Sequence, residues 1–143
     1  MIAIGCDHGG YALKCEIIKH LAERGEEFID CGCGGETVDY PDIAKKVCDK
    51  FTNGEADKCI LICGTGIGMS MAANKINGIR AALCGDTYSA KFTRLHNDAN
   101  VLCMGARVIG AGLACEIVDA FLGAEFEGGR HVARVQKMMD LED

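Results

Sequence analysis

The sequence has no tryptophan, a single proline and no excess of basic residues. Its 15 lysines and arginines are outnumbered by 21 aspartates and glutamates, so it lacks the basic face that a general nucleic-acid binder needs. No apolar run approaches the roughly 20 residues that cross a bilayer. The first ten residues, MIAIGCDHGG, have no basic segment before their apolar run, which argues against a signal peptide. We therefore expect a cytoplasmic protein that acts on a small molecule and binds neither nucleic acid nor a membrane.

The ten cysteines include no CxxC pair and no cysteine–histidine cluster with zinc-finger spacing. Most lie singly inside apolar runs such as KCILIC, a pattern typical of small buried side chains in a reducing compartment. Cys31 and Cys33 are the one close pair, and a metal site there is an alternative that this spacing alone supports only weakly. We expect no structural metal and no disulfide framework.

The chain contains no linker, repeat or low-complexity tract, which predicts a single domain over residues 1–143. Apolar runs predict buried strands at residues 2–5, 58–62 and 101–104, with weaker strand patterns at 27–30 and 80–84. Amphipathic patterns predict intervening helices near 13–21, 42–51, 71–76, 89–95 and 113–122, and a last helix from 129 to about 139. The pattern thus alternates strand and helix, with one extra helix at the C-terminal end.

This alternation predicts a doubly wound α/β/α sandwich with a five-stranded parallel sheet, a Rossmann-like fold. Our preferred strand order is the flavodoxin-like order 2-1-3-4-5. In such a fold, ligands bind beyond the carboxyl ends of the strands, near the switch point between the first and third strands. The stretches that follow those two strands are CDHGG and CGTGIGMS, and both are rich in groups that do chemistry.

The stretch CGTGIGMS is a glycine loop that fits neither the GxGxxG fingerprint nor a Walker loop. The stretch instead predicts a strand that runs through a glycine turn into the start of a helix, where exposed N–H groups favour binding of an anion. A tight turn that binds no ligand is the alternative interpretation. Cys63 stands at the mouth of this loop, where helix N–H groups would favour a thiolate that acts as a nucleophile or a base. Core packing is the alternative interpretation of Cys63.

Three further groups are candidates for binding a sugar or a phosphate. Asp7 and His8 follow the first strand, where Asp7 could also cap a helix. Arg130 and Arg134 are four residues apart on one helical face, which suits phosphate but also occurs on solvated faces. Arg107 lies just past the fifth strand.

His96 and Asn97 lie between the fourth helix and the fifth strand, on the side of the sheet opposite Cys63. A helix-capping turn would explain them without any function. If His96 shares a substrate with Cys63, however, the topology requires two subunits that face each other. This geometry predicts a homodimer with active sites shared between subunits, and such dimers could pair into a tetramer.

Six stretches in order, GCDHGG, DYP, ICGTGIG, AANK, HNDAN and GGRH, resemble the ribose-5-phosphate isomerase type B family over nearly the whole chain. The resemblance implies an aldose–ketose isomerase, free of metal and cofactor, that interconverts ribose 5-phosphate and ribulose 5-phosphate through a cis-enediolate. It implies that Cys63 is the general base, that Thr65 moves protons among the oxygens, and that His96 opens the furanose ring with help from Asp7. The N–H groups of residues 66–70 would form the anion hole.

The resemblance also implies which residues bind the substrate. Tyr40 and Asn97 would contact the sugar, and one histidine and three arginines would hold the phosphate. The implied set is His8, Tyr40, Gly64, Gly66, Ile67, Gly68, Met69, Ser70, Asn97, Arg107, Arg130 and Arg134. Some members of the family use a glutamate where this chain has Met69, so this sequence resembles the cysteine type.

Three alternatives stay open. The presence of HND and GGRH favours a pentose phosphate, but a six-carbon sugar 6-phosphate, allose or galactose, is an alternative substrate. A non-catalytic sugar-phosphate sensor would not need Cys63, Thr65 and His96 together. A flavodoxin-like nucleotide or flavin binder is disfavoured by the absence of tryptophan and of a standard fingerprint.

Overall fold

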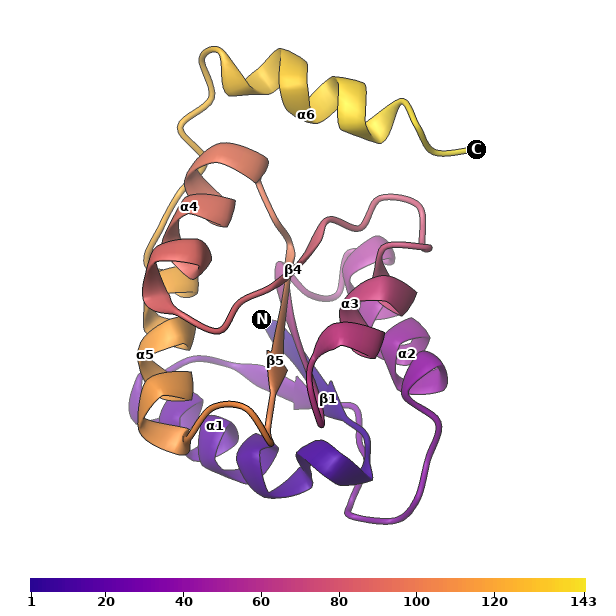
Figure 1. The fold of residues 1–143 in the computed structure, drawn as a ribbon, viewed down its shortest axis with the longest axis vertical. Helices are drawn as coiled ribbons and strands as arrows, with labels where there is room; N and C mark the ends of the chain where they lie inside the picture. Colours follow the sequence, from indigo (N-terminus) through magenta and orange to yellow (C-terminus); the bar gives the residue numbers. More distant parts are fainter.

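The computed structural model describes residues 1–143, in which strands alternate with helices along the chain (Figure 1). The elements in order are β1 (Ile2–Cys6), η1 (His8–Gly10), α1 (Tyr11–Glu23), β2 (Phe28–Asp30), α2 (Tyr40–Thr52), β3 (Lys58–Cys63), α3 (Ile67–Ala73), β4 (Ala81–Leu83), α4 (Thr87–Asn97), β5 (Val101–Gly105), α5 (Ala111–Leu122) and α6 (His131–Met139). Each predicted strand and helix has a counterpart. The predicted helix at 71–76 is displaced, because α3 begins directly after the glycine loop.

The five strands form one parallel sheet in the order β2-β1-β3-β5-β4. The parallel α/β/α architecture is confirmed, but the predicted order 2-1-3-4-5 is wrong in its last two strands. All five residues of β5 are buried, which suits an interior strand covered on both faces. The three-residue β4 leaves Leu83 43% exposed, so β4 occupies the edge of the sheet.

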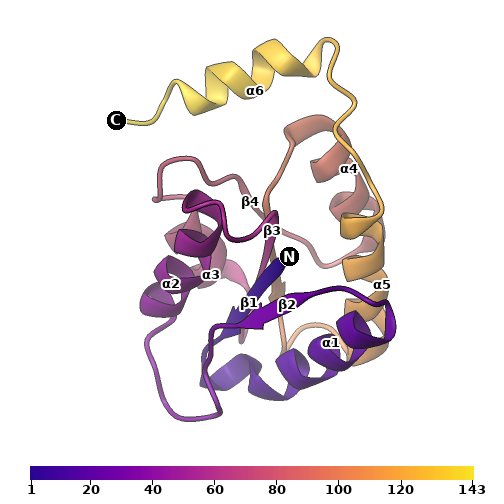
Figure 2. The same ribbon diagram turned by 180° about the vertical axis from the view of Figure 1, so that it is seen from behind.

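The helical connections between the parallel strands are distributed between the two faces of this sheet. α1, α4 and α5 cover one face, where Ile17, Ala90 and Ile117 contribute to one buried cluster. α2 and α3 cover the other face, where Val47 and Ala73 belong to a second cluster (Figure 2). The connections that leave β3 therefore run to the face opposite those that leave β1 and β5, which places switch points on both sides of β3.

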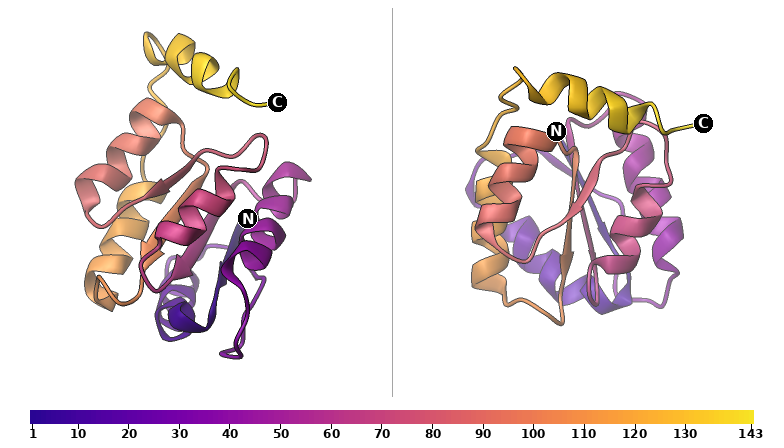
Figure 3. Two further views of the ribbon diagram at one scale, coloured as in Figure 1. Left: turned by 45° about the vertical axis from the view of Figure 1, so that its right-hand side comes forward. Right: turned by 45° about the horizontal axis from the view of Figure 1, so that its top comes forward.

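The last helix, α6, crosses the end of the molecule at which the strands begin (Figure 3). Only its first residue, His131, is buried. Val132 and Met138 are 55% and 40% exposed, so α6 leaves apolar side chains without cover within the chain. None of the helices is long and apolar enough to span a membrane.

Candidate active site

The third strand delivers Cys63 to the carboxyl end of the sheet, opposite Gly105 of β5. The Cys63 side chain is buried, and its Sγ accepts a hydrogen bond from the Gly66 N–H at 3.1 Å. Gly66 has a φ of 78°, and a Cβ there would lie 2.5 Å from Leu83 Cδ1 and 2.8 Å from the Met104 carbonyl carbon. Only glycine therefore lets the loop turn its N–H toward the sulfur. This donor is complementary to a negative charge on Cys63.

The N–H groups of the glycine loop divide into engaged and free donors. The Ile67 N–H donates to Thr65 Oγ1 at 3.2 Å, and the Ser70 N–H closes the first turn of α3. The N–H groups of Gly68 and Met69 make no hydrogen bond within the chain. The Met69 side chain is fully buried, so Met69 offers only its backbone to a ligand. The free donors for an anion thus include those at the start of α3, together with the N–H groups of Gly64 and Thr65 earlier in the loop.

The turn after β1 packs against this glycine loop. The carboxylate of Asp7 accepts a hydrogen bond from the Gly9 N–H at 2.9 Å, which is the capping role that the sequence left open. A Cβ at Gly9 would lie 3.4 Å from the Gly64 nitrogen, so the two turns are in contact. Asp7 is 9% exposed, whereas His8 beside it is exposed. The structure therefore brings Asp7 and His8 to the end of the sheet that carries Cys63.

Tyr40 and Arg107 complete this group. Tyr40 begins α2, and a Cβ at Gly68 would lie 2.7 Å from its Cε1. The backbone N–H of Arg107 donates to the Gly64 carbonyl at 2.9 Å. The guanidinium of Arg107 packs against the same residue, with Nη1 3.4 Å from a Cβ placed at Gly64. A phenol thus lies against Gly68 and a guanidinium against Gly64, both in the glycine loop.

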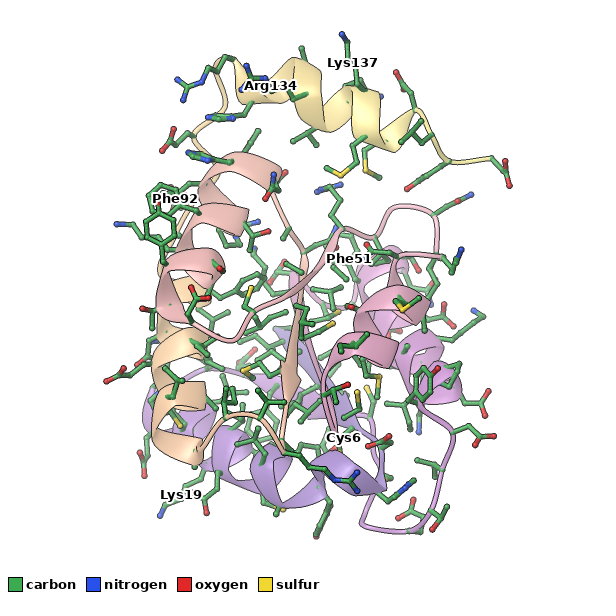
Figure 4. The ribbon with its side chains drawn as sticks, in the orientation of Figure 1. Cys6, Lys19, Phe51, Phe92, Arg134 and Lys137 are labelled. Carbon is green, nitrogen blue, oxygen red and sulfur yellow. The ribbon has the colours of Figure 1, made fainter.

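The other predicted site residues gather at the opposite end of the molecule. His96 and Asn97 end α4, while Arg130 and Arg134 belong to the start of α6. Figure 4 shows Arg134 at the far end from Cys6, the last residue of β1. The predicted placement of His96 opposite Cys63 is confirmed. Within one chain, the candidate site is therefore divided into two halves.

Two residues of this second half were not singled out from the sequence. The His131 ring stacks on His96 with centroids 4.2 Å apart, and the Glu127 carboxylate lies 3.9 Å from His96 Nε2 and 3.8 Å from His131 Nε2. Burial, together with the nearby His96, lowers the pKa of His131, which favours a neutral ring. The spacing of four residues between Glu127 and His131 was the available signal.

A cavity of about 660 Å³ lies away from Cys63, between α6 and the region around β4. Asn74, from the AANK stretch, shapes one wall: its side chain accepts a hydrogen bond from the Ala81 N–H and donates one to the Ala81 carbonyl. A second cavity of about 360 Å³ is lined by His96, Asn97, His131 and Arg134, with Val135 and Met138. Concave space in the single chain is therefore concentrated around α4 and α6.

The sequence matches the family described as Ribose/Galactose Isomerase over residues 2–138. The chain belongs to this family. Ribose-5-phosphate isomerase B of Escherichia coli is 55% identical over 142 residues, which cover 99% of this chain and 95% of that protein. D-erythrulose-4-phosphate isomerase of Pectobacterium atrosepticum is 48% identical over 139 residues, covering 96% of this chain and 91% of that protein. The resemblance inferred from the six motifs is confirmed.

Solved structures of relatives share the whole fold. Ribose-5-phosphate isomerase B of Clostridium thermocellum superposes with a TM-score of 0.96 at 55% identity, covering 98% of this chain and 95% of that one. The type B ribose 5-phosphate isomerase of Trypanosoma brucei gives 0.93 at 48% identity, covering 99% and 97%. The family's fold therefore extends over nearly all of this chain.

Proposed function

We propose that the protein is an aldose–ketose isomerase that interconverts ribose 5-phosphate and ribulose 5-phosphate through a cis-enediolate. The observation that carries this proposal is the Cys63 thiol at the end of β3, held by a glycine-loop N–H beside the free N–H groups of Gly68 and Met69. Isomerisation needs a base and preorganised donors for a developing oxyanion, and this loop supplies both. The names of the relatives support the same activity.

In the proposed reaction, His96 first opens the sugar ring by moving a proton from the O1 hydroxyl to the ring oxygen, with Asp7 assisting. The Cys63 thiolate then takes the proton from C2, and the electron pair forms the C1–C2 double bond of the enediolate. The N–H groups of Gly68 and Met69 donate hydrogen bonds to the negatively charged O1 and stabilise it. Cys63 returns the proton to C1, while Thr65 transfers a proton from O2 to O1, which leaves the ketone at C2.

The division of the site supports a homodimer in which each active site is shared between subunits. His96 lies at the end of the sheet opposite Cys63, so the two cannot meet on one sugar within one chain. The uncovered apolar residues of α6 and Leu83 on the edge strand provide surface that a second copy would bury. Pairing of such dimers into a tetramer is compatible with this arrangement.

The two halves would hold the substrate by different groups. Tyr40 beside Gly68 and Asn97 beside His96 would contact the sugar hydroxyls. His8 and Arg107 on one subunit, with Arg130 and Arg134 on the other, would surround the phosphate. Phosphate contacts remote from the reacting carbons supply orientation without a metal or cofactor. The ten free cysteines fit a reducing compartment, which supports the cytoplasm as the place of action.

Substrate length is the part of the proposal with a specific alternative. One relative is named for a four-carbon 4-phosphate, and the sequence left six-carbon 6-phosphates open. An isomerase assay with ribose 5-phosphate, erythrulose 4-phosphate, allose 6-phosphate and galactose 6-phosphate, with EDTA present, tests the assignment. We expect the highest kcat/KM with ribose 5-phosphate. Binding of all four sugars without turnover would instead indicate a non-catalytic sugar-phosphate sensor.

A further inference from the structure

Two histidines and a glutamate converge in the second half of the site. His96 comes from the last turn of α4, His131 from the start of α6, and Glu127 from the connection before α6. The two carboxylate oxygens of Glu127 face the Nε2 atoms of His96 and His131 at 3.9 and 3.8 Å, and the potential ligand atoms all lie within 4.8 Å of one another. The Glu127 N–H donates to the Leu95 carbonyl at 3.0 Å, which fixes this connection against α4.

An unsatisfied ring nitrogen points to a ligand at this cluster. His131 is only 5% exposed, and its Nε2 is buried without a hydrogen-bond partner. Buried polar atoms are normally paired, and a neutral imidazole nitrogen can be satisfied either by a proton donor or by a metal ion. The adjacent cavity of about 360 Å³, which His96 and His131 line, leaves room for the ion and for the water that would complete its coordination.

We propose that His96, Glu127 and His131 form an inhibitory binding site for a divalent transition-metal ion, best suited to Zn²⁺. Two imidazoles and one carboxylate are a recurrent three-ligand set for zinc, with a fourth position left to water. Tetrahedral zinc places its ligand atoms roughly 3.3 Å apart. Zinc binding therefore requires the two rings, which are stacked within 14° of parallel, to turn so that both Nε2 atoms point at the ion.

The charges near this cluster limit how tightly it binds a cation. Arg130 and Arg134 are the cationic side chains on the same end of α6, and their charge opposes a divalent cation. Zinc is therefore expected to bind reversibly rather than as a structural ion. Inhibition rests on the proposed function, because a metal on His96 Nε2 occupies the nitrogen that ring opening requires.

Calorimetric titration of the metal-free protein with zinc chloride tests binding independently of activity. We expect one ion per chain, with affinity at least about tenfold weaker in Glu127→Gln and in His131→Asn. Glu125→Gln is the matched control, because it removes the same charge from an exposed side chain two residues away. Cys63→Ser should bind zinc as the natural chain does. Equal weakening in the two glutamine variants, or loss of binding in Cys63→Ser, overturns the site.

Inhibition is then measured on ribose 5-phosphate turnover. We expect zinc to inhibit the natural chain and Glu125→Gln alike, EDTA to restore the activity, and Glu127→Gln to need at least about tenfold more zinc. Zinc bound at the cluster without any inhibition overturns the inhibitory part of the proposal. A chain that binds zinc at the cluster but isomerises no sugar retains the metal site and refutes the proposed function instead.

Discussion

At the scale of single residues, local surroundings separate Cys63 from the other thiols. Burial raises the pKa of Cys6 and Cys48 to about 12 and that of Cys84 to about 11, which keeps these thiols protonated and unreactive. Cys63 is also buried, yet its sulfur accepts a hydrogen bond from a loop N–H. The chemistry of a cysteine here depends on what its sulfur faces, since burial is common to most of them.

Replacing the proposed base gives the most direct test at this scale. We expect Cys63→Ala to lower kcat by roughly 10²–10⁴-fold, the usual contribution of a general base, with little change in the affinity for ribose 5-phosphate. Steady-state kinetics and calorimetric sugar binding measure the two effects. Cys15→Ala, at an exposed cysteine, is the control and should keep full activity. Substantial turnover by Cys63→Ala would refute its assignment as the base.

At the scale of elements, the glycine loop between β3 and α3 depends on one backbone conformation. Gly66 and Gly25 have nearly the same positive φ, 78° and 74°, but Gly25 has no atom within 4 Å of an added Cβ. Gly25→Ala should therefore cost only about 1 kcal/mol, from left-handed strain. Gly66→Ala should cost a further 1–3 kcal/mol or so, because its Cβ overlaps Leu83 and the backbone of Met104.

Urea unfolding of both variants measures this difference, and kinetics of Gly66→Ala at temperatures where it remains folded shows its effect on the site. The displaced Gly66 N–H would no longer reach Cys63 Sγ, so activity should fall as well. Equal destabilisation of the two variants would show that the close approach to Leu83 and Met104 relaxes easily.

The sequence patterns predicted most elements but not every relation between them. The helix predicted near 13–21 is present as α1, and Gly25 takes the left-handed conformation just after its end. The order of the last two strands was predicted wrongly, although the unbroken apolar run of β5 and the weaker pattern of β4 already indicated which strand lies inside. Strand order depends on this contrast in burial, and sequential adjacency is a poorer guide.

Sequence patterns could not predict contacts between residues that only the path of the folded chain brings together. Lys14 lies beside the apolar face of α1 yet is 1% exposed, because its ammonium group donates to Asp30 at 2.8 Å and to the Cys33 carbonyl at 2.6 Å. Glu127 meets His96 only because the connection after α5 returns along α4. Periodicity identifies a helical face, but it does not say which distant carboxylate reaches it.

At the scale of the whole molecule, the division of the site has a clear consequence. The end that carries Cys63 holds the proposed base and the free N–H groups of the glycine loop, and the other end holds His96, the proposed ring-opening group, and two arginines. Neither half alone can carry the proposed reaction from the cyclic sugar. A twofold-symmetric dimer would complete two active sites at once, because each chain contributes its Cys63 half to one site and its His96 half to the other.

This symmetry predicts how much activity two inactive variants recover when their subunits are mixed. Cys63→Ala and His96→Ala chains are mixed in equal amounts under conditions of subunit exchange. Half of the resulting dimers should be mixed, and each mixed dimer has one intact site of two, so we expect about a quarter of natural activity. Mixing Cys63→Ala with Asp7→Ala is the control: both changes lie in the same half, every shared site is damaged, and no recovery is expected. If differently tagged mixed dimers are isolated and show no more activity than this control, the active site is not shared between subunits.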